Sequence, residues 1–371
     1  METRFLTATD PEAQADAIRE AARALASGSL IVFPTETVYG VGASVMSAEA
    51  VAALEQLKGR TPDKPFTLHL ADPHEAERYA GPLPLVARRL AQKTWPGPLT
   101  LVVPDRRPHR GEPAGMIEDA VYYQRTVGLR CPRSAVGQAI LRASGVPVAG
   151  SSANLGGRPA PRDAHEALAD LRGKVAVVVD AGPTLHARAS TVVRIHEDDS
   201  FEILREGAIT ARRVERLART RVLFVCTGNI CRSPMAVGIA ARMMADRLGS
   251  APEELPLHGV EIASAGTGAA AGLPASTSAV QVMDEQGIDI RGHQSRPITV
   301  DALLAADYIW VMTESQRECV VRLAPESASR AALVDSSGED VSDPVGGTME
   351  DYRACARHLN KALAARMAEV V

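Results

Sequence analysis

The stretch Val222-Leu-Phe-Val-Cys-Thr-Gly-Asn-Ile-Cys-Arg-Ser-Pro234 contains the strongest structural signal in the chain. Its first four residues are apolar and predict a short buried strand, which a polar loop and the helical pattern of residues 234–248 follow directly. A strand that leads into a helix in this way is typical of a parallel α/β sheet, whose functional site lies at the carboxyl ends of the strands. The stretch therefore predicts an α/β fold with a site near Cys226.

The same stretch has the residue types that phosphate-monoester chemistry requires. Gly228 allows backbone N–H groups to curl into an anion-binding nest, and Arg232, six positions after Cys226, can hold two phosphate oxygens. The start of the following helix favours both a dianion and the thiolate form of the cysteine. Asp343, on an Asp-Pro turn in a Gly-rich segment, is the expected general acid. The alternative is a buried cysteine in a strand–helix turn, and strand, Gly, Arg, Ser and helix together argue against it.

The remaining C-terminal sequence continues the alternation of strands and helices. This alternation, in about 150 residues, predicts a small doubly wound parallel sheet. Strands are predicted at 260–263, 308–312 and 332–334, and helices at 275–287, 300–305, 314–323 and 350–368.

The N-terminal sequence also mixes helices and strands, starting with an amphipathic helix over 11–27 and a buried strand over 29–33. The mixture predicts a mixed, twisted α/β sheet domain that ends near Thr210. Further strands are predicted at 66–70, 99–103, 127–129, 146–149, 175–179 and 191–195, and helices at 47–58, 85–93 and 163–172. A chain of 371 residues is too long for one compact domain. We expect a domain over 1–213, a linker over 214–220 and a second domain over 221–371.

Composition and charge exclude several classes of protein. With 46% hydrophobic and 23% charged residues, the chain is ordinary globular material. The net charge is −4, and it is +2 for residues 1–219, so the arginines between 205 and 221 are interpreted as a solvated connector helix. Five cysteines without metal spacing predict reduced thiols, a cytoplasmic location and no bound metal. The uncharged run 262–283 contains Gly and Pro, so we expect a loop there and no membrane partner.

Residues 221–370 resemble the low-molecular-weight protein tyrosine phosphatase family. The matching stretches are VLFVCTGNICRSPMA, SAGT at 264–267, HQSRPIT at His293, DYIWVMT and DPVGG at Asp343. The resemblance implies a phosphatase that needs no cofactor and acts on a phosphoprotein. It implies Cys226 as nucleophile, Arg232 as phosphate clamp, Asp343 as the acid for the leaving group, Ser233 as hydroxyl donor to the thiolate and Asn229 as loop organiser. The implied phosphate loop comprises Thr227, Gly228, Asn229, Ile230, Cys231 and Ser233.

Two features leave the phosphatase substrate open between phosphotyrosine and phosphoarginine. The run Val345–Gly347 resembles the related bacterial arginine phosphatases, whereas Ile230 stands where those phosphatases have Thr. We favour phosphotyrosine because Ile230 supplies an apolar wall. Arsenate reductases share the loop, but Cys319 and Cys355 are too far apart in sequence for the closely spaced pair that they use. Cys231 is either a reversible disulfide partner of the nucleophile or a small core residue.

The N-terminal sequence contains no Walker A motif, no H-E-x-x-H and no Rossmann glycine fingerprint. Its distinctive feature is a set of cations near the ends of predicted strands. Each cation alone is more often a solvated surface charge, but together they predict a polyanion pocket without a covalent nucleophile. They are Lys58, Arg60, Lys64, Arg130 and Arg205.

Several stretches of this half, in order, resemble the YrdC-like threonylcarbamoyl-AMP synthase family over about residues 10–210. They are PTETVYGVG (34–42), KGRTPDKP (58–65), WPGPLT (95–100), the strand ending in Arg130, GSSANLGGRPAP (150–161), STVV and ILREGAIT. The resemblance implies that L-threonine, bicarbonate and ATP, with Mg²⁺, form threonylcarbamoyl-AMP and pyrophosphate. This reaction is the first step of the tRNA modification t6A, and the product passes to the tRNA threonylcarbamoyl transferase machinery.

The resemblance also implies two groups of binding residues. Around threonine it places Thr37, His69, Arg130, Ser152 and Ser190. Around ATP it places Lys58, Arg60, Lys64, Thr126, Asn154, Arg162 and Arg205. Long members of the family close the nucleotide site with another C-terminal domain, where this chain has the phosphatase. We expect a bifunctional enzyme; the alternative is that the N-terminal domain is an RNA-binding module that targets the phosphatase through weak RNA contacts.

Overall fold

The computed structural model describes residues 2–8, 10–60, 64–109, 111 and 114–370. Contacts divide the described chain into an N-terminal unit that ends at Ala218 and a C-terminal unit that begins at Arg219. The predicted linker 214–220 belongs to ordered elements, since Val214 is fully buried on α7 (Ala211–Leu217) and Thr220 begins β12 (Thr220–Cys226). The domain limits 1–213 and 221–371 stay predictions.

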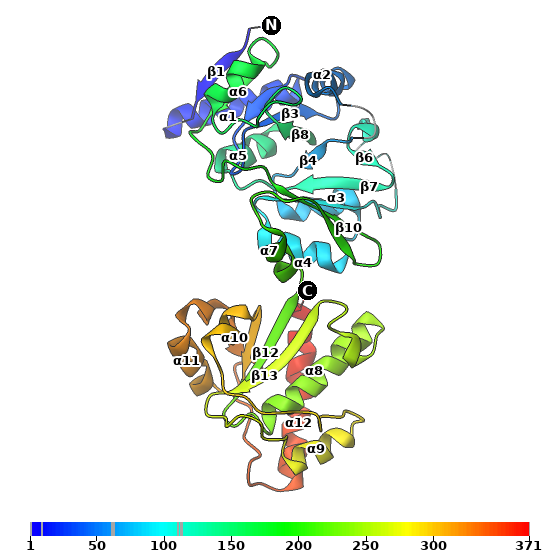
Figure 1. The fold of residues 1–371 in the computed structure, drawn as a ribbon, viewed down its shortest axis with the longest axis vertical. Coiled ribbons are helices and arrows are strands. Elements are labelled where there is room, and N and C mark those ends of the chain that lie inside the picture. The colour runs from blue at the N-terminus through cyan, green and yellow to red at the C-terminus, as the bar shows by residue number, and fades with distance from the viewer. Residues whose placement is uncertain (1, 9, 61–63, 110, 112–113, 371) are drawn as a thin grey trace. The chain divides into compact units, whose positions relative to one another are not determined.

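The N-terminal unit is built on a mixed sheet in which β6 pairs with β7 and the other strands follow the order β1-β9-β2-β3-β8-β4-β7-β5-β10-β11 (Figure 1). For example, β4 runs parallel to β7 and antiparallel to β8. The predicted mixed α/β sheet is confirmed. Its strands are β1 (Arg4–Thr7), β2 (Ile31–Phe33), β3 (Gly40–Ser44), β4 (Thr67–His69), β5 (Leu99–Pro104), β6 (Tyr122–Tyr123), β7 (Thr126–Arg130), β8 (Val148–Ser152), β9 (Val177–Asp180), β10 (Thr191–Ile195) and β11 (Phe201–Arg205).

Helices pack on both faces of this sheet. Ile31 and Phe33 belong to one apolar cluster and Val32 to another, and successive strand residues point to opposite faces. The first cluster includes Leu25 of α1 and Ile140 of α5, whereas α2, α3, α4, α6 and α7 contribute to the second. The helices are α1 (Pro11–Ala26), α2 (Ala48–Lys58), α3 (Ala76–Ala80), α4 (Leu85–Thr94), α5 (Ala135–Ser144), α6 (Ala164–Leu171) and α7, with short 3₁₀ helices at Pro73–Glu75 and Glu118–Ala120.

The C-terminal unit is a four-stranded sheet in the order β13-β12-β14-β15, and every neighbouring pair is parallel. Phe224 packs with α8, α9 and α12 on one face, and Val225 packs with α10 and α11 on the other. The predicted doubly wound parallel sheet is thus confirmed. Its remaining elements are β13 (Val260–Gly266), β14 (Tyr308–Val311), β15 (Ala331–Leu333), α8 (Arg232–Leu248), α9 (Thr277–Asp284), α10 (Val300–Ala305), α11 (Glu314–Leu323) and α12 (Met349–Glu369), with 3₁₀ helices at Pro252–Glu254 and Pro325–Arg330.

Local sequence explains how helices next to the sites begin and end. The Ser47 side chain accepts the N–H of Ala50 at the start of α2, and Gly59, with φ 56°, ends the helix directly before Arg60. In the described structure α8 has no side-chain cap at its start, which follows Cys231. The first N–H groups of α8 are therefore available to an anion.

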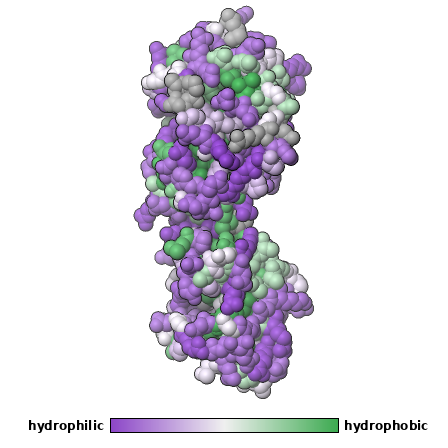
Figure 2. All heavy atoms as spheres, turned by 90° about the vertical axis from the view of Figure 1, so that its right-hand side faces the viewer, coloured by the Kyte–Doolittle hydropathy of each residue, from purple (hydrophilic) through white to green (hydrophobic). Residues whose placement is uncertain are grey.

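Most large apolar residues of the described chain are buried in the interior of the two units. On the face drawn in Figure 2, hydrophilic residues cover most of the surface of both units. Within the described ranges, no helix combines the length and apolarity needed to cross a membrane.

Candidate active sites

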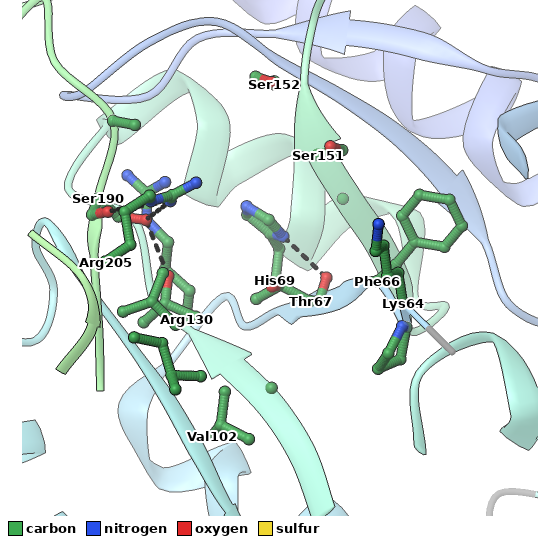
Figure 3. Close-up of a pocket in the computed structure, with 18 of the residues that line it drawn as sticks. Lys64, Phe66, Thr67, His69, Val102, Arg130, Ser151, Ser152, Ser190 and Arg205 are labelled. Atoms are coloured by element: carbon green, nitrogen blue, oxygen red, sulfur yellow. Dashed lines mark hydrogen bonds between the residues drawn. The ribbon is translucent and has the colours of Figure 1, made fainter. Parts of the chain in front are cut away.

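The N-terminal unit contains a cavity of about 440 Å³ at the centre of its sheet (Figure 3). Residues of β4, β7, β8, β10 and β11 line it, together with the segment that follows α2. The described lining includes five cationic side chains and no carboxylate. The cations are Arg60, Lys64, Arg130, Arg194 and Arg205. The cavity is therefore suited to a polyanionic ligand.

Arg130 ends β7 and is buried against the segment between β2 and β3. Its Nη2 donates to Thr37 Oγ1 at 2.6 Å and to Glu36 Oε1 at 2.9 Å. The Thr35 hydroxyl lies 2.9 Å from that of Thr37 and donates to the carbonyl of Val38. Thr37 itself is fully buried behind the guanidinium. It therefore orients Arg130 from behind the cavity wall.

His69, at the end of β4, is held as a neutral imidazole. Its Nδ1 lies 3.1 Å from the carbonyl of Thr67, which can only accept, so Nδ1 carries the proton (Figure 3). Burial, and then the charge of Arg130, lower the pKa of His69 to about 3. A Cβ at Gly150 would lie 2.4 Å from Nδ1, so only glycine fits beside the ring. The unprotonated Nε2 remains as a hydrogen-bond acceptor.

Ser190 and Arg205 also line the cavity, near Arg130 (Figure 3). Arg205 Nη2 donates to the Ser190 carbonyl at 3.0 Å and to Ser190 Oγ at 3.3 Å, and Ser190 Oγ lies 2.9 Å from Thr100 Oγ1. Burial, and then the charge of Arg130, lower the pKa of Arg205. Burial and the charge of Arg205 lower that of Arg60. Mutual repulsion of these cations favours a bound anion.

Lys58, which the resemblance places at ATP, donates several hydrogen bonds to the end of β8 and to the loop after it. Its ammonium donates to the Ser152 carbonyl at 2.9 Å, the Asn154 carbonyl at 2.7 Å and Asn154 Oδ1 at 3.2 Å. Burial, followed by the charge of Arg60, lowers the pKa of Lys58 to about 8. Asn154 Nδ2 also donates to the carbonyls of Leu155 and Arg158. Lys58 and Asn154 therefore shape the loop that presents Ser152 to the cavity.

Arg60 turns back over the start of β4. Its guanidinium carbon lies 4.4 Å from the centre of the Phe66 ring, and Nη1 donates to the Lys64 carbonyl at 3.0 Å. Residues 61–63 of the motif KGRTPDKP lie outside the described residues.

The structure brings most of the predicted N-terminal site residues together. His69, Arg130, Ser152 and Ser190 line the cavity with Arg60, Lys64, Thr126 and Arg205. Arg162 is not among the described lining residues, and its backbone N–H donates to Glu166 Oε2 at 2.8 Å. Thr35, Glu36 and Thr100 were given no role by the sequence reasoning, although the motifs PTETVYGVG and WPGPLT contain them.

In the C-terminal unit, the loop between Cys226 and Arg232 is held with its carbonyls outward. The carbonyl oxygens of Cys226, Thr227 and Ile230 accept backbone N–H groups of Thr267, Gly268 and Ser276 at 2.8–3.0 Å, and the Asn229 carbonyl accepts His293 Nε2 at 2.7 Å. Asn229 itself has a φ of 55°, which turns the chain sharply. This arrangement leaves loop N–H groups to face the interior of the loop, and the Asn229 N–H points at Cys226 Sγ at 3.2 Å. The loop is an anion nest around a sulfur.

Ser233 and Asn229 orient the hydrogen bonds to that sulfur. Ser233 Oγ lies 2.9 Å from Cys226 Sγ and accepts Asn229 Nδ2 at 2.8 Å. Since Asn229 donates to the hydroxyl, the hydroxyl proton is free to point at the sulfur and stabilise a thiolate. Asn229 Nδ2 also donates to Ser264 Oγ at 2.8 Å, and Oδ1 accepts the N–H of Arg296.

Arg232 and Asp343 meet over the loop. Arg232 Nη2 forms an ion pair with Asp343 Oδ2, and Nη1 donates to the carbonyl of Val341 at 3.1 Å. The N–H of Val341 donates to the carbonyl of Met312, the residue directly after β14, and this bond anchors the segment that contains Asp343. The Arg232 side chain is 5% exposed and that of Asp343 is 43% exposed. Asp343 therefore stands at the solvent-facing side of the guanidinium, where a leaving group would depart.

Two further contacts complete the loop. Gln316 is buried, accepts the N–H groups of Met312 and Thr313 through Oε1, and donates to Thr227 Oγ1 at 3.1 Å. Its position three residues after Thr313, at the start of α11, is the sequence signature of a capping box. Cys231 is buried, with its thiol 3.2 Å from Ser276 Oγ, and it is a free thiol in the structure.

Comparison with known proteins assigns each half. Residues 23–207 match the family model Sua5_yciO_yrdC, whose description is telomere recombination, and residues 221–371 match that of low molecular weight phosphotyrosine protein phosphatases. The chain belongs to both families. Membership in these two enzyme families confirms both resemblances that the sequence motifs indicated.

Individual relatives agree with this assignment. The threonylcarbamoyl-AMP synthase of Bacillus subtilis is 38% identical over 213 residues, which are 57% of this chain and 58% of that protein. This chain thus spans little more than half of that relative. A protein-arginine-phosphatase of Geobacillus stearothermophilus is 37% identical over 153 residues, which are 40% of this chain and 94% of that protein. The crystal structure of Pyrococcus abyssi Sua5 complexed with L-threonine shares the fold, with a TM-score of 0.52, 23% identity and coverage of 71% of this chain and 92% of that one.

Proposed function

We propose that the N-terminal unit is a threonylcarbamoyl-AMP synthase that joins L-threonine, bicarbonate and ATP. The observation that supports it most is the cavity itself, in which His69, Arg130 and Ser190 lie beside Arg60 and Arg205. The first three offer an acceptor, a cation and a hydroxyl to an amino acid, and the arginines offer positive charge to phosphates. The P. abyssi relative was solved with L-threonine.

In the proposed reaction, the threonine amine and bicarbonate form a carbamate with loss of water. A carbamate oxygen then attacks the α-phosphorus of ATP, the bond to the bridging oxygen breaks, and pyrophosphate leaves. No protein nucleophile is needed, so the residues act by positioning and by neutralising charge. ATP enters as its Mg²⁺ complex; since the described lining has no carboxylate, phosphate oxygens and water would hold that ion. The product would pass to the tRNA threonylcarbamoyl transferase machinery of the cytoplasm.

The decisive experiment measures pyrophosphate released from ATP by the full-length protein. Release that requires both L-threonine and bicarbonate supports the proposal. Salt-sensitive tRNA binding without such release would support the alternative, an RNA-binding module that targets the phosphatase.

The replacement Arg130→Ala is expected to lower threonine-dependent pyrophosphate release by about 10²–10³-fold. It removes the cation from the cavity and leaves the buried Glu36 carboxylate without its ion-pair partner. The unpaired buried charge should also lower the free energy of unfolding of the N-terminal unit by about 3–5 kcal/mol, measurable by denaturant titration. Hydrolysis of p-nitrophenyl phosphate should stay near wild type, since the two sites belong to separate units. Arg133→Ala, which changes an exposed neighbour, is the matched control; loss of both activities in Arg130→Ala would contradict the division into two units.

We also propose that the C-terminal unit is a cysteine-dependent protein phosphatase. The supporting observation is the loop in which Cys226 Sγ, the Asn229 N–H and Ser233 Oγ converge beside Arg232. In the proposed reaction the substrate phosphate enters the loop and replaces Asp343 as the partner of Arg232. The thiolate attacks phosphorus, Asp343 protonates the leaving group, and water then hydrolyses the phosphocysteine.

Ile230 tests the choice between phosphotyrosine and phosphoarginine. The Ile230 side chain is half-buried and lies beside Gly228. A Cβ atom added to Gly228 would be 3.6 Å from Ile230 Cγ1, so the Ile230 side chain flanks the loop. We propose phosphotyrosine as the preferred substrate because this flank is apolar. Ile230→Thr is expected to raise phosphoarginine turnover relative to phosphotyrosine several-fold, as measured by phosphate release from the two substrates. Faster hydrolysis of phosphoarginine by the wild-type protein would refute the preference and agree with the name of the Geobacillus relative.

A further inference from the structure

Glu36 is a buried carboxylate with both oxygens in use. Its side chain is 2% exposed and lies between β2 and β3. Oε1 accepts Arg130 Nη2 at 2.9 Å, and Oε2 accepts the backbone N–H of Arg133 at 2.7 Å. The carbonyl of Glu36 also accepts the N–H of His186. Glu36 is thus fixed by the backbone on two sides and in turn holds the guanidinium of Arg130.

The guanidinium of Arg130 is held at one nitrogen and unpaired at another. Its hydrogen bonds within the described chain all leave from Nη2, to Glu36, Thr37 and Thr35. Nε is buried and has no partner among the described residues. Buried donors are rarely left unpaired in folded proteins, and Arg130 lines the cavity (Figure 3). Since Nη2 makes all of these hydrogen bonds, the remaining donors of the guanidinium are left for a ligand with an acceptor oxygen at this end of the cavity.

The other charges that line the cavity repel the guanidinium of Arg130 and would not hold it in place. The described lining of the cavity is cationic without a carboxylate, and Arg205 lies close enough for its pKa to be lowered by the charge of Arg130. Glu36 supplies the compensating charge from behind the wall, because it contacts Arg130 but does not line the cavity. A planar guanidinium held on one side by a carboxylate has a fixed orientation, which a lone cation on a flexible side chain lacks.

We propose that Glu36 is a positioning residue that fixes Arg130 so that the remaining donors of its guanidinium face the carboxylate of the amino-acid substrate. The proposal rests on the synthase activity proposed above and adds to it a source of amino-acid affinity. Glu36 does not touch the substrate, so its loss should weaken threonine binding and leave ATP binding intact.

The test is Glu36→Gln in the full-length protein, which keeps the size of the side chain and removes its charge. The KM for L-threonine is expected to rise about 10- to 100-fold, while kcat falls less than about 3-fold and the KM for ATP is unchanged. If Glu36 had a merely structural role, its replacement would not raise the KM for L-threonine while leaving kcat and the KM for ATP nearly unchanged. Arg133→Ala is the matched control, because it removes an exposed side chain and keeps the backbone N–H that Glu36 accepts; it should behave as wild type.

Glu36→Asp provides the second variant, since it keeps the charge on a shorter side chain. Its threonine KM should lie between those of wild type and Glu36→Gln, and it decides the question alone if Glu36→Gln does not fold. An unchanged threonine KM in either folded variant, or equal increases in the KM of threonine and ATP, would overturn the proposal. Absence of threonine-dependent pyrophosphate release in the wild type would instead refute the proposed synthase. Calorimetric titration of L-threonine into wild type and variants would then still test Glu36.

Discussion

Cys226→Ser is expected to lower phosphatase turnover by about 10⁴-fold or more for every leaving group. A serine hydroxyl at this position remains largely protonated at neutral pH, so neither the N–H of Asn229 nor the hydroxyl of Ser233 has an anion to stabilise. Phosphate release from p-nitrophenyl phosphate and from phosphotyrosine peptides would measure the loss.

Cys319→Ser is the matched control for this replacement. Cys319 lies on α11, is partly exposed and is a free thiol like Cys226. It should retain wild-type turnover. Both variants should keep threonine-dependent pyrophosphate release, because the nucleophile belongs to the other unit. Appreciable turnover in Cys226→Ser would show that phosphoryl transfer does not pass through this sulfur.

Asp343→Asn is expected to lower turnover by about 10²–10⁴-fold for poor leaving groups and much less for activated aryl phosphates. Asn keeps the shape of the side chain but cannot give a proton to the departing oxygen. Its amide also cannot pair with Arg232 as the carboxylate does, so inhibition by inorganic phosphate should become stronger. The measurement is kcat across a series of aryl phosphates of increasing leaving-group pKa.

The control for this series is Glu339→Gln, which removes an exposed carboxylate from the same loop segment. Its dependence on leaving group should match wild type. If Asp343→Asn slowed good and poor leaving groups equally, the acid assignment would fail, and Glu339 and Asp340 would become the candidates. Asp340 is the less suitable of these, because its Oδ1 already accepts the N–H of Glu314 at the start of α11.

Most elements were predictable from local pattern, and β3 is an exception with a physical reason. The run Gly40–Ser44 was not predicted as a strand, and it contains two glycines, which are uncommon inside strands. In the fold β3 passes directly over the ring of Phe33, and a Cβ at Gly40 or Gly42 would lie 3.0–3.1 Å from ring atoms. These glycines are therefore explained by a contact across the sheet, which no local pattern contains.

The two sites differed in how far their residues could be predicted. The phosphate loop is one continuous segment between a strand and a helix, so the spacing of Cys226 and Arg232 already placed sulfur and guanidinium at one strand end. The N-terminal site is assembled from separate segments. The motif places Lys58 at ATP, and in the structure its ammonium donates hydrogen bonds to Ser152 and Asn154, 94 and 96 residues away. The motif marked an important residue without showing what it contacts.

The sequence by itself determined the two families, the parallel sheet of the C-terminal unit and the cysteine that we propose as its nucleophile, because strand periodicity and loop spacing are local properties of the chain. Only the tertiary structure decided which cations share a cavity and how each is oriented. Arg130 and Glu36 are 94 residues apart, and neither has a distinctive local pattern that names the other. Their pairing arises because the sheet brings the end of β7 beside the segment between β2 and β3, where burial makes an uncompensated charge costly.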